Sequence, residues 1–240
     1  MPENLLIRSV DLRIGSLEEY NRRQREKATL HSNKPKPRPC ITLSREFGCE
    51  GYPVAERLRE IMMQKTGDEW VMIDKAVLEE VARHHNISEE ILQTLGENNR
   101  ILNEVLATFS PRWKSDHECF MLLSRHIVAL AEQGNVIIVE LGGAIITKHI
   151  EHSYHFRIYG STAFKAATLA GRLKIEADAA EKLMLKQQKL RDHFTSDFLG
   201  QDDHDPALYN VLFNNDRVAP GAIAHTIADF VCAGYAERRI

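Results

Sequence analysis

Residues Ser44 to Gly51 form a short polar loop whose place in the sequence suits the binding of a phosphate group. An apolar run, Cys40–Leu43, precedes the loop, and a helical pattern of apolar residues follows it. A loop that joins a strand to a helix presents backbone N–H groups and the helix N-terminus to one anion. Gly48 and Gly51 permit a tight turn, whether or not a ligand lies in it. The residues that we expect to hold the phosphates are Ser44, Arg45, Gly48, Cys49 and Gly51.

The loop departs from the standard pattern G-x-x-x-x-G-K-[ST], in which the Lys reaches the phosphates and the hydroxyl contacts Mg²⁺. Here Glu50 stands in place of the second Gly, Gly51 in place of the Lys, and Tyr52 in place of the Ser or Thr. A carboxylate ~4 Å from a phosphate would cost on the order of 4 kcal/mol at an effective dielectric constant of about 20. The direction of the Glu50 side chain therefore decides whether phosphate is opposed. Arg45 either supplies the missing positive charge or pairs with Glu46 or Glu50.

Five short apolar runs alternate with helical patterns along the chain after residue 39. The run Val136–Val139 is the richest in β-branched residues and indicates a buried parallel strand. This alternation predicts an α/β fold in which one parallel sheet lies between two helical layers. The predicted strands are 40–43, 70–73, 136–139, 154–158 and 208–214. The predicted helices are 53–65, 76–85, 116–133, 161–173, 178–194 and 220–236, with others after residues 88 and 143, and an acidic loop spans 195–206.

Residues 1–38 have the character of an extension that ends in a basic, proline-spaced linker. The segment Lys34–Arg38 is expected to be extended, and it serves either as a tether or as a basic tail that touches a partner. The net charge of −3 gives no general attraction to nucleic acid, and no apolar run approaches the length of a membrane span. The charged N-terminus is unlike a signal peptide, so we expect a cytoplasmic protein.

The four cysteines are widely scattered and include no C-x-x-C pair. We expect reduced, mostly buried thiols, and the alternative is an exposed, reactive Cys49 in the loop. The acidic stretch Asp202–Asp205 and the histidines His149, His152 and His155 are read as ordinary solvated or structural residues, so no metal site is expected.

Four sequence strings, in order along the chain, resemble the cytidylate kinase-like branch of the nucleoside monophosphate kinases. They are Ile41-Thr42-Leu43-Ser44-Arg45-Glu46-Phe47-Gly48, Ile73-Asp74-Lys75, Gly142-Gly143-Ala144, and Asp205-Pro206-Ala207-Leu208-Tyr209 followed by Asn214. The resemblance covers roughly residues 39–231. It implies that residues 39–240 form a three-layer P-loop kinase-like domain with a five-stranded parallel sheet and a mobile helical lid near residues 165–195. A base pocket is implied beside the last strand.

The resemblance also implies roles for residues outside the loop. Arg172 and Arg191 would neutralise the transferring phosphoryl group from the lid, unless they belong to an ordinary charged helix. Asp74 and Lys75 would lie on the acceptor side, although Asp74 equally suits a helix cap and Lys75 a solvated position. The pattern departs from the family at Glu140-Leu141-Gly142-Gly143, where Gly-Arg-Gly is usual, so a second cation is missing.

Two functions remain open from the sequence. The first is ATP-dependent phosphoryl transfer, with Mg²⁺, to a small nucleotide or another small phosphorylated ligand. The second is a catalytically silent binding or regulatory module, which Glu50, Tyr52 and Leu141 favour. Nucleic-acid binding, suggested only by the basic linker, is a distant third, and the sequence does not specify an oligomeric state.

Overall fold

The chain folds into a three-layer α/β structure. The computed structural model describes residues 38–74, 114–140 and 142–237. The predicted extension and linker lie outside these residues except for Arg38. Lys75, Leu141 and the helices predicted between residues 76 and 113 also lie outside them.

One parallel sheet of five strands forms the middle layer, in the order β2-β3-β1-β4-β5. The strands at and beside its centre are buried along nearly their whole length because helices cover both faces of the sheet. β1 lies at the centre of the sheet, so the loop that follows it opens at the middle of the sheet's carboxyl edge. The strands are β1 (Cys40–Arg45), β2 (Val71–Ile73), β3 (Val136–Val139), β4 (Ser153–Tyr159) and β5 (Val211–Asn214).

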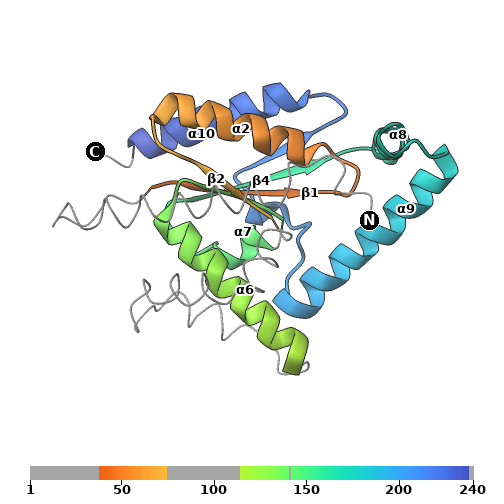
Figure 1. Ribbon diagram of the computed structural model, residues 1–240, viewed down its shortest axis with the longest axis horizontal. Helices are drawn as coiled ribbons and strands as arrows, with labels where there is room; N and C mark the ends of the chain where they lie inside the picture. The colour runs from red at the N-terminus through yellow and green to blue at the C-terminus, as the bar shows by residue number, and fades with distance from the viewer. Residues whose placement is uncertain (1–37, 75–113, 141, 238–240) are drawn as a thin grey trace.

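Helices cover the two faces of the sheet (Figure 1). On one face, α2 (Gly51–Thr66) and α10 (Pro220–Glu237) pack against each other and against a large apolar core that includes Ile41 and Leu43 of β1. On the other face lie α6 (Lys114–Gln133) and the short α7 (Gly143–Ile146). Side chains alternate along a strand, so Thr42 of β1 faces α7. The described helices include none that is long and apolar enough to cross a membrane.

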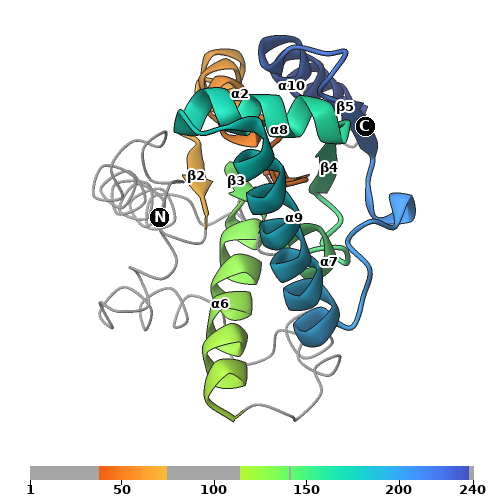
Figure 2. The same cartoon turned by 90° about the vertical axis from the view of Figure 1, so that its right-hand side faces the viewer.

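Two further helices, α8 (Thr162–Leu173) and α9 (Ala177–Phe194), form the lid predicted from the sequence. They lie across the carboxyl edge of the sheet (Figure 2). Ser161 caps α8, since its hydroxyl oxygen accepts a hydrogen bond from the N–H of Phe164 at 3.2 Å. Phe47 from the loop packs with Leu169, Ala180 and Met184 in a small apolar cluster, which joins the lid to the loop.

The structure corrects the sequence prediction near the end of the sheet. The last strand begins at Val211 rather than at residue 208. Asp205 caps a 3₁₀ turn over Pro206–Leu208 by accepting from the N–H of Ala207 at 2.9 Å, so this segment is a turn and not a strand. Residues Thr195–Leu199, predicted to be loop, continue α9 as a π-helical turn.

The cysteine side chains in the described segments support the structural interpretation over the reactive one. Cys49 is only 1% exposed, although it lies in the loop after β1. Burial raises the pKa of its thiol to about 12, so it is protonated at neutral pH. The alternative of an exposed, reactive Cys49 is therefore wrong.

Candidate functional site

The loop between β1 and α2 keeps the tight shape that the sequence predicts. Its first N–H, on Glu46, donates to the carbonyl oxygen of Ile158 at 3.0 Å. The N–H of Cys49 donates to the carbonyl oxygen of Glu46 at 3.1 Å. Gly48 has a φ of 101°, and a Cβ there would lie 2.8 Å from the Cβ of Lys165 in the lid. Gly48 is thus required both by the backbone turn and by the close approach of α8.

Two side-chain amides occupy N–H groups of the loop. The N–H of Phe47 donates to Oε1 of Gln188 on α9, and the N–H of Glu50 donates to Oδ1 of Asn215, which follows β5; both distances are 2.8 Å. In a phosphate-binding loop such donors face phosphate oxygens. Here the chain supplies neutral oxygens of its own in their place, so the resting loop is already satisfied at these two positions.

Basic side chains of α8 pair with both glutamates of the loop. Nζ of Lys165 lies 2.6 Å from Oε2 of Glu46, and Nη2 of Arg172 lies 3.0 Å from Oε1 of Glu50. These four side chains are between 13% and 28% exposed, so both pairs are shielded from bulk water. The carboxylate of Glu50 therefore turns toward the lid, and Arg172 neutralises it.

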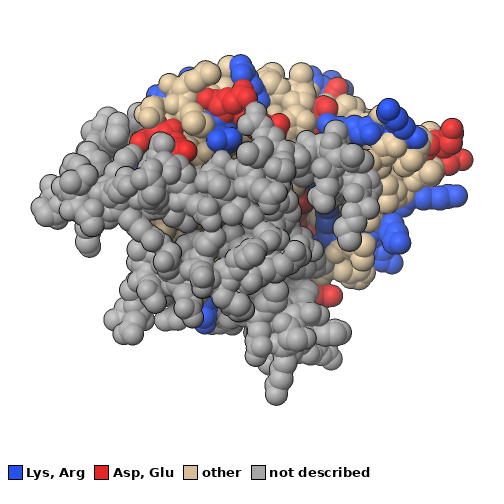
Figure 3. All heavy atoms as spheres, in the orientation of Figure 1, with Lys and Arg blue, Asp and Glu red and all other residues tan. Residues whose placement is uncertain are grey.

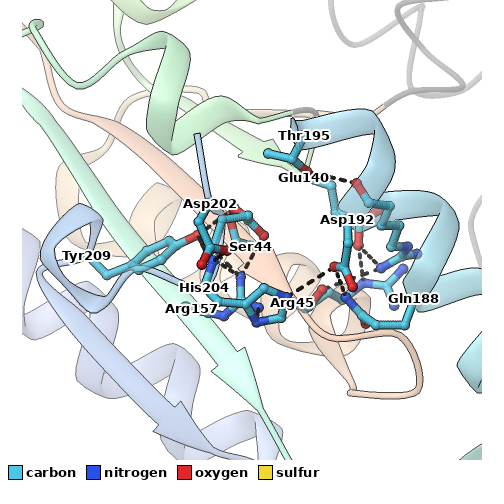
Figure 4. A network of polar contacts seen from close by, with 12 residues as sticks. Ser44, Arg45, Glu140, Arg157, Gln188, Asp192, Thr195, Asp202, His204 and Tyr209 are labelled. Carbon is cyan, nitrogen blue, oxygen red and sulfur yellow. Dashed lines mark hydrogen bonds and ion pairs between the residues drawn. The ribbon is translucent and has the colours of Figure 1, made fainter. Parts of the chain in front are cut away.

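A second cluster of charged side chains lies at the carboxyl ends of β1 and β3 (Figure 4). Oε1 of Glu140 forms an ion pair with Nε of Arg45 at 3.2 Å and accepts a hydrogen bond from Nη1 of Arg191. Arg45 also lies over the ring of Tyr52, 4.9 Å from its centroid, and Arg191 lies 4.8 Å from that of Phe47. Arg45 thus pairs with Glu140, a partner that neither of the two sequence alternatives named.

Asp74, at the end of β2, is buried and receives a hydrogen bond from the hydroxyl of Tyr52 at 2.9 Å. Burial, together with the negative charge of Asp74, raises the pKa of Tyr52 well above its usual range. The Tyr52 hydroxyl is therefore a neutral donor held by a carboxylate. It does not act as the free hydroxyl that a standard phosphate loop offers to a metal.

A buried ion pair, not expected from the sequence, lies beneath the sheet on the far side from α2. Arg157 of β4 is 2% exposed, and its Nη1 lies 2.6 Å from Oδ2 of Asp203. The hydroxyl of Tyr209 donates to Oδ1 of Asp203 at 2.6 Å. Oγ of Ser44 lies 3.5 Å from the same Oδ1, so the base of the loop touches this pair.

His204 connects this ion pair to the lid (Figure 4). Its Nδ1 lies 2.9 Å from Nη2 of Arg157, and its Nε2 lies 3.1 Å from Oδ1 of Asp192 on α9. A guanidinium only donates, so Nδ1 accepts and Nε2 carries the proton given to Asp192. Asp192 also accepts from Gln188, whose amide oxygen holds the loop. A cavity of about 330 Å³ opens beside His204 at the end of α9.

Changing Asp203 to Asn is expected to lower the free energy of unfolding by about 2–3 kcal/mol, because Arg157 would keep a buried charge without a carboxylate partner. Urea unfolding of the purified variant measures this loss. The neighbouring Asp202→Asn variant is the matched control, since Asp202 is exposed and its change is expected to cost less than about 1 kcal/mol. Equal effects of the two substitutions would contradict the assignment of Asp203 as the main partner of Arg157.

The structure brings together nearly all of the residues singled out from the sequence. Ser44, Arg45, Gly48, Cys49 and Gly51 form the end of β1, the loop and the start of α2. Arg172 and Arg191 reach this region from the lid, and they are only partly exposed rather than solvated. Asp74 reaches it through Tyr52, while Lys75 lies outside the described residues. Figure 3 shows other lysine and arginine side chains exposed at the lid end of the molecule.

Sequence reasoning missed the acceptors that close the site. Gln188 and Asn215 carry no prediction from the sequence, and Glu140 enters it only as a departure from the usual pattern. Asn215 follows directly after Asn214, the last residue of β5. A usable signal is that Glu140 and Asn215 follow the ends of parallel strands, where polar side chains gather at one edge of the sheet.

Comparison with known proteins gives one family match and a set of similar folds. The sequence model described as "Cytidylate kinase-like family" matches residues 40–217. An uncharacterised protein from Eubacterium ventriosum superimposes with a TM-score of 0.62 at 16% identity, over 82% of this chain and 99% of that chain. Shikimate kinase from Bacteroides thetaiotaomicron gives a TM-score of 0.41 at 13% identity, over 80% and 98% of the two chains. No curated protein matches the sequence. The structure from Eubacterium ventriosum shares the fold of this chain.

Proposed function

The chain belongs to the cytidylate kinase-like family, and from this membership we propose that it transfers a phosphoryl group from ATP to a small nucleotide-type acceptor. The observation that carries the proposal is the convergence of basic side chains on one loop. Arg45 comes from β1, Lys165 and Arg172 from α8, and Arg191 from α9. Phosphoryl transfer is catalysed chiefly by positioning and by neutralising phosphate charge, and this set of cations suits that task.

The loop from Ser44 to Gly51 would hold the phosphates of the donor. Its backbone turns tightly at Gly48, and α2 begins directly after it. Binding requires Gln188 and Asn215 to release the N–H groups that they now occupy. Because both acceptors are neutral amides, this exchange replaces a weaker acceptor with a charged one and favours the phosphate.

The residues fit the phosphates of ATP better than they fit its Mg²⁺ ion. The position that supplies the metal-binding hydroxyl in a standard loop is Tyr52, which is bonded to Asp74. Within the described segments, no three His, Cys, Asp or Glu side chains are arranged to hold a metal. We therefore assign no step to Mg²⁺ and treat its requirement as a quantity to be measured.

The lid arginines would act on the transferring group. In the resting chain Arg172 is paired with Glu50 and Arg191 with Glu140. When a donor and an acceptor are bound, these guanidinium groups would transfer to phosphate oxygens. The bond from the γ-phosphorus to the bridging oxygen of ATP would break, and a bond to an oxygen of the acceptor phosphate would form. Asp74 would lie on the acceptor side.

A catalytically silent binding or regulatory module is the second candidate. It is favoured by the internal pairing of the site, since Glu46, Glu50 and Glu140 neutralise basic side chains and two amides occupy the loop. Such a module would use the same surfaces to hold the lid closed over the loop.

Calorimetric titration with ATP and CMP, with and without Mg²⁺, beside a coupled assay of ADP release, separates the two candidates. Phosphoryl transfer predicts ADP release that depends on a nucleoside monophosphate. Turnover with any such acceptor excludes the silent module. Absence of ATP binding up to millimolar concentration excludes the transferase.

A further inference from the structure

Glu140 is a single carboxylate shared by two arginines at the centre of the site. The same atom, Oε1, pairs with Nε of Arg45 at 3.2 Å (Figure 4). It also accepts a hydrogen bond from Nη1 of Arg191. Glu140 directly follows β3, and Arg45 ends β1, the strand paired with it. The carboxylate is 27% exposed and the Arg45 side chain only 6% exposed, so this pair is sheltered from water.

Contacts other than those with Glu140 fix the position of both arginines. Arg45 stacks on the ring of Tyr52, and Arg191 lies over the ring of Phe47 and donates to the carbonyl oxygen of Arg45 at 3.4 Å. A Cβ on Gly51 would lie 2.2 Å from Cδ of Arg45, so the glycine makes room for this side chain across the first turn of α2. Two preorganised guanidinium groups facing one point form a binding site for a tetrahedral oxyanion.

The backbone at Glu140 disfavours the residue that stands there. Its φ is +66°, in the left-handed region that glycine enters freely and other residues enter at a cost of roughly 1 kcal/mol. The local backbone therefore does not account for a glutamate at this position. The contact that does account for it is the double pairing of its carboxylate with Arg45 and Arg191.

We propose that the Glu140 carboxylate occupies, in the resting protein, the place of a ligand phosphate between Arg45 and Arg191. A phosphate group enters the site by displacing this carboxylate, so Glu140 sets a threshold for binding. The ligand class is a tetrahedral oxyanion with two negative charges, such as a phosphate monoester, because a dianion competes with a carboxylate for two guanidinium groups better than a monoanion does. This inference rests on the proposed function, and it adds that the Glu140 carboxylate competes with the ligand phosphate for the two arginines.

The probe is inorganic phosphate, titrated by calorimetry into the full chain in a low-salt buffer. Glu140→Gln removes the charge and keeps the side-chain size, and it is expected to lower the dissociation constant for phosphate by about tenfold or more. Glu140→Gly removes the carboxylate in a residue that the backbone accepts, and the same gain is expected. Glu181→Gln, at an exposed position on α9, changes the net charge equally and is expected to shift affinity by less than about twofold.

A second substitution locates the phosphate. Adding Arg191→Gln to the Glu140→Gln background is expected to abolish the gain, because one of the two guanidinium groups is then lost. Phosphate affinity that stays within about twofold of the wild type in both Glu140 variants overturns the proposal. A gain that survives loss of Arg191, or that Glu181→Gln reproduces, overturns it as well.

The ADP-release assay on the same proteins distinguishes a failure of the Glu140 proposal from a failure of the proposed function. Nucleotide turnover by the wild type without any gain in phosphate affinity at Glu140 rejects the internal competitor alone. A gain at Glu140 in a chain that never turns over nucleotide rejects the transferase and retains the anion site.

Discussion

Replacing Arg191 with alanine is expected to lower kcat for phosphoryl transfer by roughly 100- to 1000-fold, the usual effect of removing a charged group that acts on the transition state. The guanidinium lies beside the loop, 4.8 Å from the centroid of the Phe47 ring. Charge on the transferring group changes most in the transition state, so the loss is expected mainly in kcat. The KM for ATP is expected to rise by less than about threefold, since the loop still binds the donor. Steady-state kinetics with varied ATP measure both values.

Two further variants distinguish a catalytic role for Arg191 from a structural one. Lys189→Ala removes an exposed cation from the same helix and is expected to leave kcat unchanged. Arg191→Lys keeps the charge but loses the planar fork of donors, so kcat is expected to lie between those of the wild type and Arg191→Ala. If Arg191→Ala raises KM and lowers the melting temperature while kcat stays constant, the residue only holds the lid closed.

Much of the fold could be predicted because the signals for it are local. The run Val136–Val139 is apolar and β-branched, and it forms the buried strand β3 as expected. Ser161 begins α8 as its cap. The sequence predicts the last strand too early, from residue 208, because an apolar run follows residues 208–210. In the structure Asp205 and Pro206 impose a turn first, and the strand begins at Val211. Here turn chemistry prevailed over the apolar pattern.

The charged contacts of the site could not be predicted in the same way, because each joins residues far apart in the sequence. The sequence leaves the direction of the Glu50 side chain open, and the pairing of Glu50 with Arg172 depends on how the lid packs over the loop. For Arg45 the sequence leaves two roles open, a positive charge for the phosphates or an ion pair with its sequence neighbours Glu46 or Glu50. The parallel pairing of β1 with β3 instead places Glu140 beside it. Sequence distance is a poor guide to charge pairing at the edge of a parallel sheet.

The ion pairs around the loop also bear on the absence of the lysine that a standard phosphate loop carries. The four basic side chains around the loop pair with three carboxylates of the chain, those of Glu46, Glu50 and Glu140. A loop with a free lysine would attract phosphate without rearrangement. Under the proposed function, ligand binding would instead be an exchange of ion-pair partners, and affinity would depend on the difference between two sets of ion pairs.

Acidification from about pH 7 to about pH 5 is expected to lower the free energy of unfolding by about 2 kcal/mol for each of two buried histidines. Burial lowers the pKa of His126 and of His155 from its ordinary value of 6.5 to about 4 in the folded chain. The unfolded chain therefore binds more protons than the folded chain between these values. Stability is complete above pH 6.5 and falls as the pH decreases toward 4.

The two histidines resist protonation for related reasons. His126 of α6 is fully buried, and neither of its ring nitrogens bonds to a described residue. His155 of β4 is 9% exposed, and its Nδ1 lies 2.8 Å from Oγ1 of Thr42. A charged imidazolium in either place would lose its hydration without gaining a carboxylate among the described contacts.

Urea unfolding at several pH values, on the wild type and on matched variants, isolates this effect. His126→Met and His155→Asn are each expected to remove about half of the excess loss at low pH, because neither replacement side chain titrates in this range. His225→Asn changes an exposed histidine of α10 and is expected to keep the full wild-type dependence. Carboxylates elsewhere titrate alike in all four proteins, so the difference between curves belongs to the substituted histidine. If the curves of the two buried-site variants run parallel to that of the wild type, the acid sensitivity arises elsewhere, and the two histidines accept protons in the folded chain.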